Sequence, residues 1–306
     1  MKKKRVIGIV GPTASGKTAL SLPVAKALGA EIVCMDSMQI YRGMDIGTAK
    51  PTPAERASVP HHMLDFLSPD QEYSVSQYAS DARRAIEKIH TPLLVGGTGL
   101  YLQALSLPMD FGAVGGDEAI RKKYHALADA EGAKAVHGRL RAVDPASAEK
   151  LHPNDLRRVI RALEVYELTG TPLSAQKMPG PEDAPYDFLL YAVDLPRDAL
   201  YARVDRRVDE MMAAGLMDEV RALLEGGLSP DAQSMQGLGY KELAPVALAG
   251  APLADAVSLI KLRTRHFAKR QLTWFKRDGR IRWLPWQPGA PAEPLIAKII
   301  EEATEE

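Results

Sequence analysis

The chain has 306 residues, of which 46% are hydrophobic and 25% charged, the composition of a globular protein that can form a full α/β domain and a smaller partner. Lys plus Arg equals Asp plus Glu at 39 each, so the formal net charge is zero and any nucleic-acid affinity needs a local basic patch. The single cysteine, Cys34, excludes an intrachain disulfide and a cysteine-ligated metal site. No apolar run approaches the roughly 18–20 residues of a membrane span, and we expect a soluble, cytoplasmic protein without a signal peptide.

A phosphate-binding loop follows the first predicted strand. Residues 6–10 form a short apolar run, residues 19–28 have helical spacing, and the glycine-rich stretch between them matches the Walker A, or P-loop, pattern. Backbone N–H groups of such a loop surround an anion together with the free amides of the following helix. Lys17 would contact terminal phosphate oxygens, and Thr18 would ligate Mg²⁺. The residues expected to hold a di- or triphosphate, either a nucleotide such as ATP or another one, are Gly11, Pro12, Thr13, Ala14, Ser15, Gly16, Lys17 and Thr18.

A carboxylate ends the second predicted strand, residues 31–35, where Asp36 begins the sequence Asp-Ser-Met-Gln. Parallel α/β sheets bind ligands at the carboxyl ends of their strands. We expect this strand to lie beside the one that feeds the P-loop. Asp36 would then be placed to accept a proton from a nucleophile near the phosphate, a contribution of roughly 10² to 10⁴ in rate. The alternative is an ordinary turn residue or helix cap.

Loop-rich sequence follows over residues 40–65. The adjacent His61 and His62 lack a third ligand at metal-binding spacing, so we interpret them as structural. Ser74 is placed to cap a helix whose apolar residues recur at three or four positions as far as Ile89.

The third predicted strand, residues 93–95, runs directly into the sequence Gly-Gly-Thr-Gly-Leu-Tyr at residues 96–101. We expect Thr98 and the neighbouring amides to form a second polar wall of the phosphate cleft. The alternative is a tight strand-to-helix turn without a ligand.

A helical segment interrupts the sheet. Its best-defined helix begins near Asn154 and has Gly170 as its stop signal, and no strand signal appears until residues 188–193. The prediction is an α/β fold with a P-loop NTPase-like parallel sheet core and an inserted all-helical lobe. The core comprises residues 1–112 and 186–306, and the lobe comprises residues 113–185.

Two arginines share a face of the helix predicted to begin at Asp198. Arg203 and Arg207 are four residues apart, so they lie together on one side of it. Two close guanidinium groups favour an anion between them, and arginine suits bidentate phosphate contacts. The alternative is a surface face paired with Asp205 or Glu210.

A long helix over residues 253–275 and a short strand over residues 283–286 complete the predicted core. Ile260, Phe267 and Trp274 recur every seven residues, and we expect them to form the packed side of the helix.

The same region is strongly basic. Residues 261–282 contain nine Lys or Arg against one acidic residue, which predicts a phosphate-binding surface, the alternative being a solvated basic helix. Lys261, Arg265 and Lys269 lie on one flank of it. A second basic cluster on the inserted lobe suggests a polyanion longer than a nucleotide, and it consists of Arg157, Arg158 and Arg161.

The combined motifs resemble those of tRNA dimethylallyltransferases of the bacterial type. The matching segments are residues 11–18, 36–41, 45–51, 61–65, 96–101, 239–242 and 270–275, in the order found in that family. Among them, Asp-Ser-Met-Gln and Asp-Ile-Gly-Thr-Ala-Lys-Pro are far more specific than the P-loop. Leu238 is a local departure, because Ile or Val is more usual there, and the zinc-finger extension of eukaryotic relatives does not follow the last motif.

The resemblance implies transfer of a dimethylallyl group from dimethylallyl diphosphate to N6 of the adenine just 3′ of the tRNA anticodon, with diphosphate as the leaving group. It implies that Asp36 is the base, that Thr18 helps hold the substrate and Mg²⁺, and that Lys17, Arg203 and Arg207 stabilise the departing charge. The expected partners are dimethylallyl diphosphate and the anticodon stem-loop of tRNA, bound by a monomer. The residues expected to contact tRNA are Asp36, Ser37, Met38, Gln39, Thr98, Arg121, Arg157, Arg158, Val159, Ile160, Arg161, Gly239, Tyr240 and Lys241, with Arg265 and Lys269 of the basic helix.

Two other functions compete with this one. A P-loop small-molecule kinase explains the phosphate loop but leaves the basic helix and the helical lobe without a role. A non-catalytic RNA-binding protein explains the basic surfaces, but Asp36, Lys17 and Thr18 are all intact. Incubation with ATP and candidate acceptors, compared with dimethylallyl diphosphate and tRNA, distinguishes them.

Overall fold

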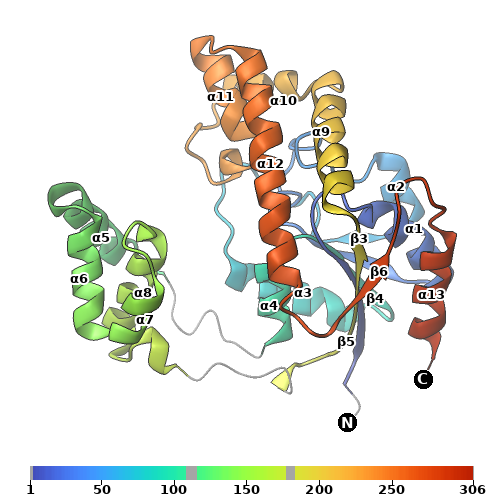
Figure 1. Cartoon of the computed structure of the whole chain (residues 1–306), viewed down its shortest axis with the longest axis horizontal. Helices are drawn as coiled ribbons and strands as arrows, with labels where there is room; N and C mark the ends of the chain where they lie inside the picture. The colour runs from blue at the N-terminus through green and yellow to red at the C-terminus, as the bar shows by residue number, and fades with distance from the viewer. Residues whose placement is uncertain (1–2, 108–115, 177–182, 306) are drawn as a thin grey trace. The chain divides into compact units, whose positions relative to one another are not determined.

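The computed structural model describes residues 3–107, 116–176 and 183–305, and these fall into two compact units (Figure 1). One unit comprises Met1–Ser106 and Ala184–Glu306, and the other comprises Leu107–Asp183. The first boundary that the sequence suggested, between residues 112 and 113, lies outside the described residues. No helix in the described part of the chain is long and apolar enough to cross a membrane.

The larger unit contains a parallel sheet whose strand order is β3-β2-β4-β1-β5-β6. This order corrects one expectation, because β4 lies between β2 and β1. The carboxyl ends of β2 and β1 nevertheless flank the same residue, since Met35 and Val10 are both in register with Gly96. The strands are β1 (Arg5–Val10), β2 (Glu31–Met35), β3 (His61–His62), β4 (Pro92–Gly96), β5 (Asp187–Asp194) and β6 (Ile281–Pro285).

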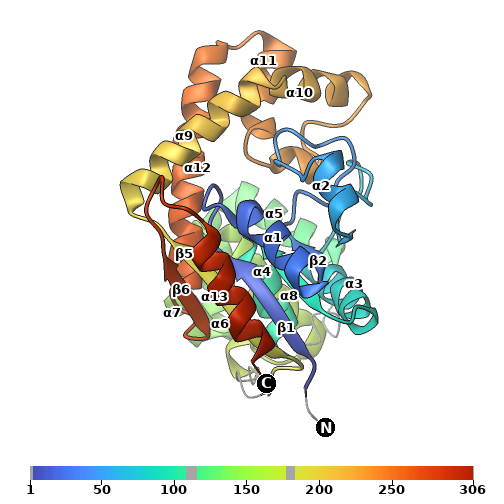
Figure 2. The same cartoon turned by 90° about the vertical axis from the view of Figure 1, so that its right-hand side faces the viewer.

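Both faces of the sheet are covered by helices, because its central strands are apolar on both sides. In β1, Val6 and Val10 contribute to one apolar cluster and Ile7 and Ile9 to the other. On the second face, α1 (Lys17–Leu28) packs against α13 (Glu293–Thr304), as Figure 2 shows. The remaining helices of this unit are α2 (Pro53–Ser58), α3 (Val75–Lys88), α4 (Gly99–Ser106), α9 (Arg197–Ala213), α10 (Leu216–Glu225), α11 (Tyr240–Ala249) and α12 (Leu253–Phe275).

Several local predictions are confirmed in this unit. Ser74 caps α3, with its hydroxyl accepting from the Gln77 amide in a capping box. The long helix begins and ends where expected and buries Ile260 as predicted, but Trp274 is 41% exposed, and the buried residues near it are Gln271 and Phe275. The seven-residue spacing misassigned Trp274, since α12 follows the 3.6-residue period of a straight helix. His61 and His62 form the two-residue edge strand β3, and the imidazole of His62 lies 2.7 Å from Glu31.

The smaller unit is entirely helical over its described residues apart from connecting segments. Its apolar centre includes Tyr124, Val136, Leu140 and Leu163. The carboxylate of Asp144 caps the third helix by accepting from the Ser147 amide at 3.0 Å. The helices are α5 (Glu118–Glu131), α6 (Ala133–Val143), α7 (Pro145–Lys150) and α8 (Leu156–Thr169), followed by the short 3₁₀ turn Leu173–Ala175.

Candidate active site

The P-loop connects the end of β1 to the start of α1 and has the backbone of an anion-binding turn. Gly11 and Gly16 have φ angles of 131° and 96°, and Ala14 has a φ of 61°. No side chain caps α1, so the amides of its first turn are available to a ligand. The buried hydroxyl of Ser15 has no hydrogen-bond partner in the described part of the chain. A buried polar atom without a partner costs free energy, and a phosphate oxygen in this loop would relieve that cost.

Three cations surround this loop. Lys17 Nζ donates to the Pro12 carbonyl at 2.6 Å, and Arg203 Nε donates to the Ala14 carbonyl at 2.8 Å. The guanidinium of Arg203 also stacks on the Trp286 ring, 5.2 Å from its centroid. Arg207 is partly buried and makes no hydrogen bond within residues 3–107, 116–176 and 183–305.

The acidic residues that were the alternative partners of these arginines are engaged elsewhere. Asp205 accepts from Arg265 at 2.7 Å, and Glu210 pairs with Arg206 at 3.4 Å. Arg203 is therefore held by the loop and not by a surface carboxylate, which supports the phosphate interpretation of this pair.

The pKa of Lys17 is lowered to about 8, chiefly because the amine is buried and next because Arg207 repels its charge, while Asp36 acts in the opposite direction. Burial likewise lowers the pKa of Arg207, and Asp36 opposes that shift too. Asp36, Lys17 and Arg207 therefore lie close enough to interact electrostatically. A diphosphate would relieve the repulsion between the two cations.

These pKa shifts predict how anion binding depends on pH. Below pH 8, Lys17 is charged and inorganic pyrophosphate binds without proton uptake. Above pH 8, binding must recharge the amine, so the Kd should rise by up to about tenfold per pH unit. Calorimetry between pH 6.5 and 9.5 measures this, with Lys17→Arg as the control, because arginine stays protonated and retains only the ligand's own titration. Equal pH slopes for both proteins would contradict the prediction.

Asp36 lies at the carboxyl end of β2 and serves partly as a turn residue. Its Oδ1 accepts from the Met38 amide at 2.9 Å and, more weakly, from the Gln39 amide at 3.4 Å. Its Oδ2 has no hydrogen bond from the described residues, so this oxygen is available to take a proton. Asp36 can therefore be both a turn residue and a base, because Oδ1 holds the turn and Oδ2 is available to the substrate. The adjacent Ser37 amide donates to Thr98 Oγ1 at 3.2 Å, which joins this segment to the turn after β4.

Gln271 is a site residue that the sequence reasoning missed. It lies on α12, and its Oε1 accepts from the Thr13 amide at 2.9 Å while its Nε2 donates to the Gly97 carbonyl at 2.8 Å. A Cβ added at Gly97 would lie 2.5 Å from that nitrogen, so a side chain there would displace the Gln271 amide. Gln271 therefore fixes the P-loop against the turn after β4. The available signal was a polar side chain on the buried side of a helix, which needs partners.

Four of the expected tRNA contacts are corrected by burial. Val159 and Ile160 are 0% and 3% exposed in the apolar centre of the smaller unit, so their side chains pack within it. Tyr240 is 1% exposed and donates to Glu219 at 2.6 Å, and the neighbouring Gly239 is buried as well. Both motifs, residues 157–161 and 239–241, lie along a helix or at its start. Consecutive residues of a helix face different directions, so some residues of each motif point into the protein.

The arginines of the smaller unit differ in their availability. Arg121 and Arg161 both pair with the fully buried Glu164, at 2.7 and 2.5 Å, and the amide of Asp117 also donates to it. Arg157 and Arg158 are exposed. Arg121 and Arg161 are therefore oriented by an internal carboxylate.

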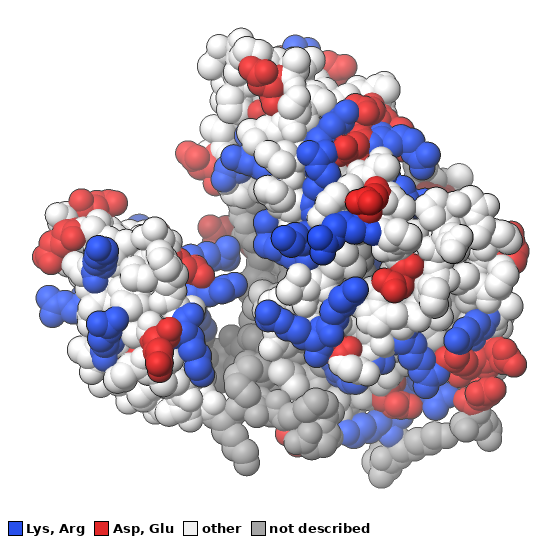
Figure 3. All heavy atoms as spheres, in the orientation of Figure 1, with Lys and Arg blue, Asp and Glu red and all other residues white. Residues whose placement is uncertain are grey.

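The basic helix is partly neutralised within its own unit. Lys and Arg side chains gather over the face on which α12 lies (Figure 3), but several are paired. Arg265 pairs with Asp205 at 2.7 Å, Lys261 with Asp209 at 2.6 Å, and Arg263 with Glu242 at 2.7 Å. Lys269 and Arg270 are exposed and have no acidic partner among the described residues. The positive surface is thus concentrated in the second half of α12, where Trp274 is also exposed.

Comparisons with known proteins agree on one family. The IPP transferase family matches residues 39–278, and the Isopentenyl transferase family matches residues 4–68. A tRNA dimethylallyltransferase of Pelotomaculum thermopropionicum is 48% identical over 99% of this chain and 98% of its own, and one of Carboxydothermus hydrogenoformans is 47% identical over the same shares.

Solved structures agree with this assignment. The tRNA isopentenylpyrophosphate transferase of Bacillus halodurans has a TM-score of 0.74 and is 39% identical over 98% of this chain and 96% of its own. A eukaryotic dimethylallyltransferase acting on tRNA has a TM-score of 0.81 and is 30% identical over 96% of this chain and 77% of its own. The P-loop sheet, the carboxylate at the end of β2 and these relatives lead to one conclusion: the chain belongs to the tRNA dimethylallyltransferase family.

Proposed function

We propose that this protein transfers the dimethylallyl group of dimethylallyl diphosphate to N6 of the adenine 3′-adjacent to a tRNA anticodon and releases diphosphate. The observation that carries the proposal is the electrostatic interaction of Asp36 with both Lys17 and Arg207. An acceptor amine at Asp36 is then next to a diphosphate in the P-loop. The solved eukaryotic relative acts on tRNA, which agrees with this choice of acceptor.

The acceptor needs a base, because the lone pair of the adenine amine is delocalised into the ring. Asp36 Oδ2 takes a proton from N6 as the bond from N6 to the first carbon of the dimethylallyl group forms. The bond from that carbon to the diphosphate oxygen breaks, and its electron pair leaves with diphosphate. Oδ1 stays bound to the Met38 amide throughout and keeps the carboxylate oriented.

The leaving group needs positive charge where its negative charge develops. Lys17, Arg203 and Arg207 supply it, together with the P-loop amides of residues 11–18. Arg203 is already positioned by its bond to the loop, so it need not reorganise during the reaction.

A magnesium ion suits the same place. Thr18 is exposed in the first turn of α1, and its hydroxyl has no hydrogen bond to the described residues. Among all the residues that the structure describes, no group of three His, Cys, Asp or Glu side chains is placed to hold a metal. Mg²⁺ at phosphate sites typically uses one or two protein ligands and completes its shell with phosphate oxygens and water. The residues therefore fit an ion held by Thr18 and the diphosphate, which would neutralise the leaving group's charge.

The nucleic acid must present its adenine unstacked, as bases in anticodon loops can be. Residues 36–39 and Thr98 line the carboxyl edge of the sheet, where the base would be held. Lys241, Arg157 and Lys269 are exposed and available for the RNA backbone, whereas the exposed Arg158 pairs with Asp155 at 3.3 Å. We propose that the enzyme acts on tRNA in the cytoplasm as a monomer.

Two basic residues one helical turn apart should differ in their effect on tRNA binding. Lys269→Ala should weaken binding of all substrate tRNAs and reduce the salt slope by about one, because one phosphate contact is lost. Arg265→Ala should have the smaller effect, since that guanidinium is held by Asp205. Filter binding at salt concentrations of roughly 50 to 300 mM, a range that includes physiological ionic strength, gives the tRNA Kd of each variant. The salt dependence of these Kd values distinguishes Lys269→Ala from Arg265→Ala. A larger loss for Arg265→Ala would contradict the assignment.

The proposed activity has a direct test. Unmodified tRNA is incubated with the protein and dimethylallyl diphosphate, digested to nucleosides and examined by mass spectrometry for dimethylallyl adenosine. Parallel reactions contain ATP and nucleoside acceptors in place of these substrates. ATP-dependent phosphorylation without prenylated tRNA would favour the kinase and overturn the proposal.

A further inference from the structure

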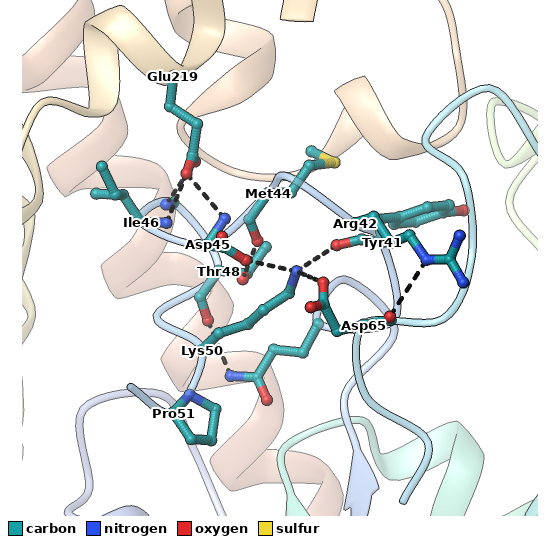
Figure 4. Close-up of polar contacts among 12 residues, drawn as sticks. Tyr41, Arg42, Met44, Asp45, Ile46, Thr48, Lys50, Pro51, Asp65 and Glu219 are labelled. Atoms are coloured by element: carbon teal, nitrogen blue, oxygen red, sulfur yellow. Dashed lines mark hydrogen bonds and ion pairs between the residues drawn. The ribbon is translucent and has the colours of Figure 1, made fainter. Parts of the chain in front are cut away.

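A half-buried carboxylate occupies an anion-binding turn beside the adenine-recognition segment, residues 36–39. Figure 4 shows Glu219 of α10 pointing into the loop of residues 45–50. Its Oε2 accepts from the amides of Asp45 and Ile46, both at 2.8 Å, and its Oε1 accepts from the Gly47 amide at 3.1 Å. Successive amides that converge in this way form a cradle for one anion.

The same carboxylate has a fourth donor. The hydroxyl of the buried Tyr240 donates to Glu219 Oε1 at 2.6 Å. A Cβ added at Gly47 would lie 2.6 Å from the Tyr240 ring, so the loop backbone packs directly on that ring. Both carboxylate oxygens thus receive two hydrogen bonds each.

The far end of the loop is fixed by a buried cation. Lys50 donates to Asp45 at 2.7 Å, to Asp65 at 2.6 Å and to the Tyr41 carbonyl, and its side chain is 1% exposed (Figure 4). Arg56 provides a second cation for Asp65 at 2.9 Å. Because the Lys50 amine is buried, moving the loop away from it would leave that charge without its partners.

The loop in turn holds the last residue of the recognition segment. Gln39 Nε2 donates to the carbonyls of Thr48 and Ala49, at 3.0 and 3.1 Å. Its Oε1 accepts from Cys34 Sγ at 3.1 Å. Residues 36–39 are therefore tied at one end to Thr98 and at the other to a loop whose position is set by Glu219.

We propose that Glu219 is a positioning residue that sets the placement of residues 36–39, and so of the Asp36 carboxylate, relative to the adenine. The inference rests on the proposed function, since it assigns Glu219 a role in that reaction. Glu219 itself contacts neither substrate. A misplacement of about 1 Å can cost about 10²-fold in rate even when the mutated residue is remote from the chemistry.

The sharpest variant is Glu219→Gln. An amide has one oxygen, so its NH₂ group must face either two backbone N–H donors or the Gly47 amide and the Tyr240 hydroxyl. In either orientation the NH₂ group faces at least one backbone N–H. Two donors cannot hydrogen-bond to each other, so the loop must shift. The matched control is Asp218→Asn, which makes the same change of charge on the adjacent residue of α10, where Asp218 is exposed and pairs with Arg221.

The two variants and the wild-type protein are compared in kcat, in KM for tRNA and in Kd for inorganic pyrophosphate. Glu219→Gln should lower kcat by about 10 to 10²-fold and raise KM for tRNA, while pyrophosphate binds with unchanged stoichiometry and a Kd within about twofold of wild type. Pyrophosphate binding reports the P-loop, so it separates displacement of residues 36–39 from loss of folded protein. Asp218→Asn should match wild type throughout.

Each remaining outcome is decisive. Unchanged kcat in Glu219→Gln would overturn the inference, and so would an equal loss of pyrophosphate binding, which would mean that the whole fold depends on this contact. If the wild-type protein does not prenylate tRNA, it is the proposed function that is overturned. The pyrophosphate measurements remain valid in that case, because they do not require prenyl transfer. Tyr240→Phe removes one of the four donors and should give a smaller fall in kcat than Glu219→Gln.

Discussion

Asp36→Asn should lower kcat for prenyl transfer by about 10² to 10⁴-fold, the contribution expected of a positioned general base. The substitution is nearly isosteric, and the amide oxygen can still accept from the Met38 amide that holds Asp36 Oδ1. The turn after β2 should therefore survive. What is lost is the oxygen that receives no hydrogen bond from the described residues, the one assigned to take the proton from the adenine amine.

The same substitution should leave pyrophosphate binding intact or strengthen it. Asp36 carries a negative charge near Lys17 and Arg207, so its removal eliminates repulsion of the diphosphate. Asp36 also raises the pKa of Lys17, so in the variant this pKa should fall below about 8. Measurements near pH 6.5 keep Lys17 charged in both proteins and give a fair comparison.

Single-turnover prenylation with enzyme in excess over tRNA measures the chemical step, and filter binding measures tRNA affinity. Asp231→Asn is the control, because Asp231 is exposed and its carboxylate has no hydrogen bond to the described residues. A chemical step in Asp36→Asn within about threefold of wild type would show that the base lies elsewhere. Loss of tRNA affinity in place of rate would make Asp36 a binding residue only.

The order of the elements could be read from local sequence with some success. Ser74, the P-loop glycines and the apolar runs of the strands each specify their structure through residues nearby, so periodicity and capping patterns located them. Strand order could not be read in this way. That β4 lies between β1 and β2 depends on how the crossover helices pack, which no single segment encodes.

The site was predictable where one residue carries one function and less so where a network does. Lys17, Asp36 and Arg207 were identified from charge type and position, and the structure brings them together. Gln271 and Glu219 were missed because each acts on backbone amides far away in the sequence, at separations of 258 and 174 residues. Val159 and Ile160 were expected to contact tRNA as members of a contiguous motif, but the motif lies on a helix and includes its buried side.

Arg207→Gln should weaken the site for both substrate and leaving group. Removing one donor aimed at developing negative charge costs about 10² to 10³-fold in rate. Arg207 makes no hydrogen bond to the described residues, so its donors are available to the diphosphate. We expect a higher KM for dimethylallyl diphosphate and a lower kcat. Arg206→Gln is the matched control, because Arg206 is the neighbouring arginine on α9, is exposed and pairs with Glu210.

A second readout distinguishes this role from simple loss of structure, because Arg207 lowers the pKa of Lys17. Without its positive charge, that pKa should rise above about 8, so the pH at which pyrophosphate binding begins to weaken should move upward even though the affinity itself is lower. A misfolded or loosened loop would instead expose Lys17 and lose affinity at every pH without a defined inflection. Calorimetric titration of Arg207→Gln and Arg206→Gln between pH 7 and 10 measures both quantities. An inflection that stays at about 8 in Arg207→Gln would mean that the two cations do not share one anion site, and the assignment of Arg207 to the leaving group would then be wrong.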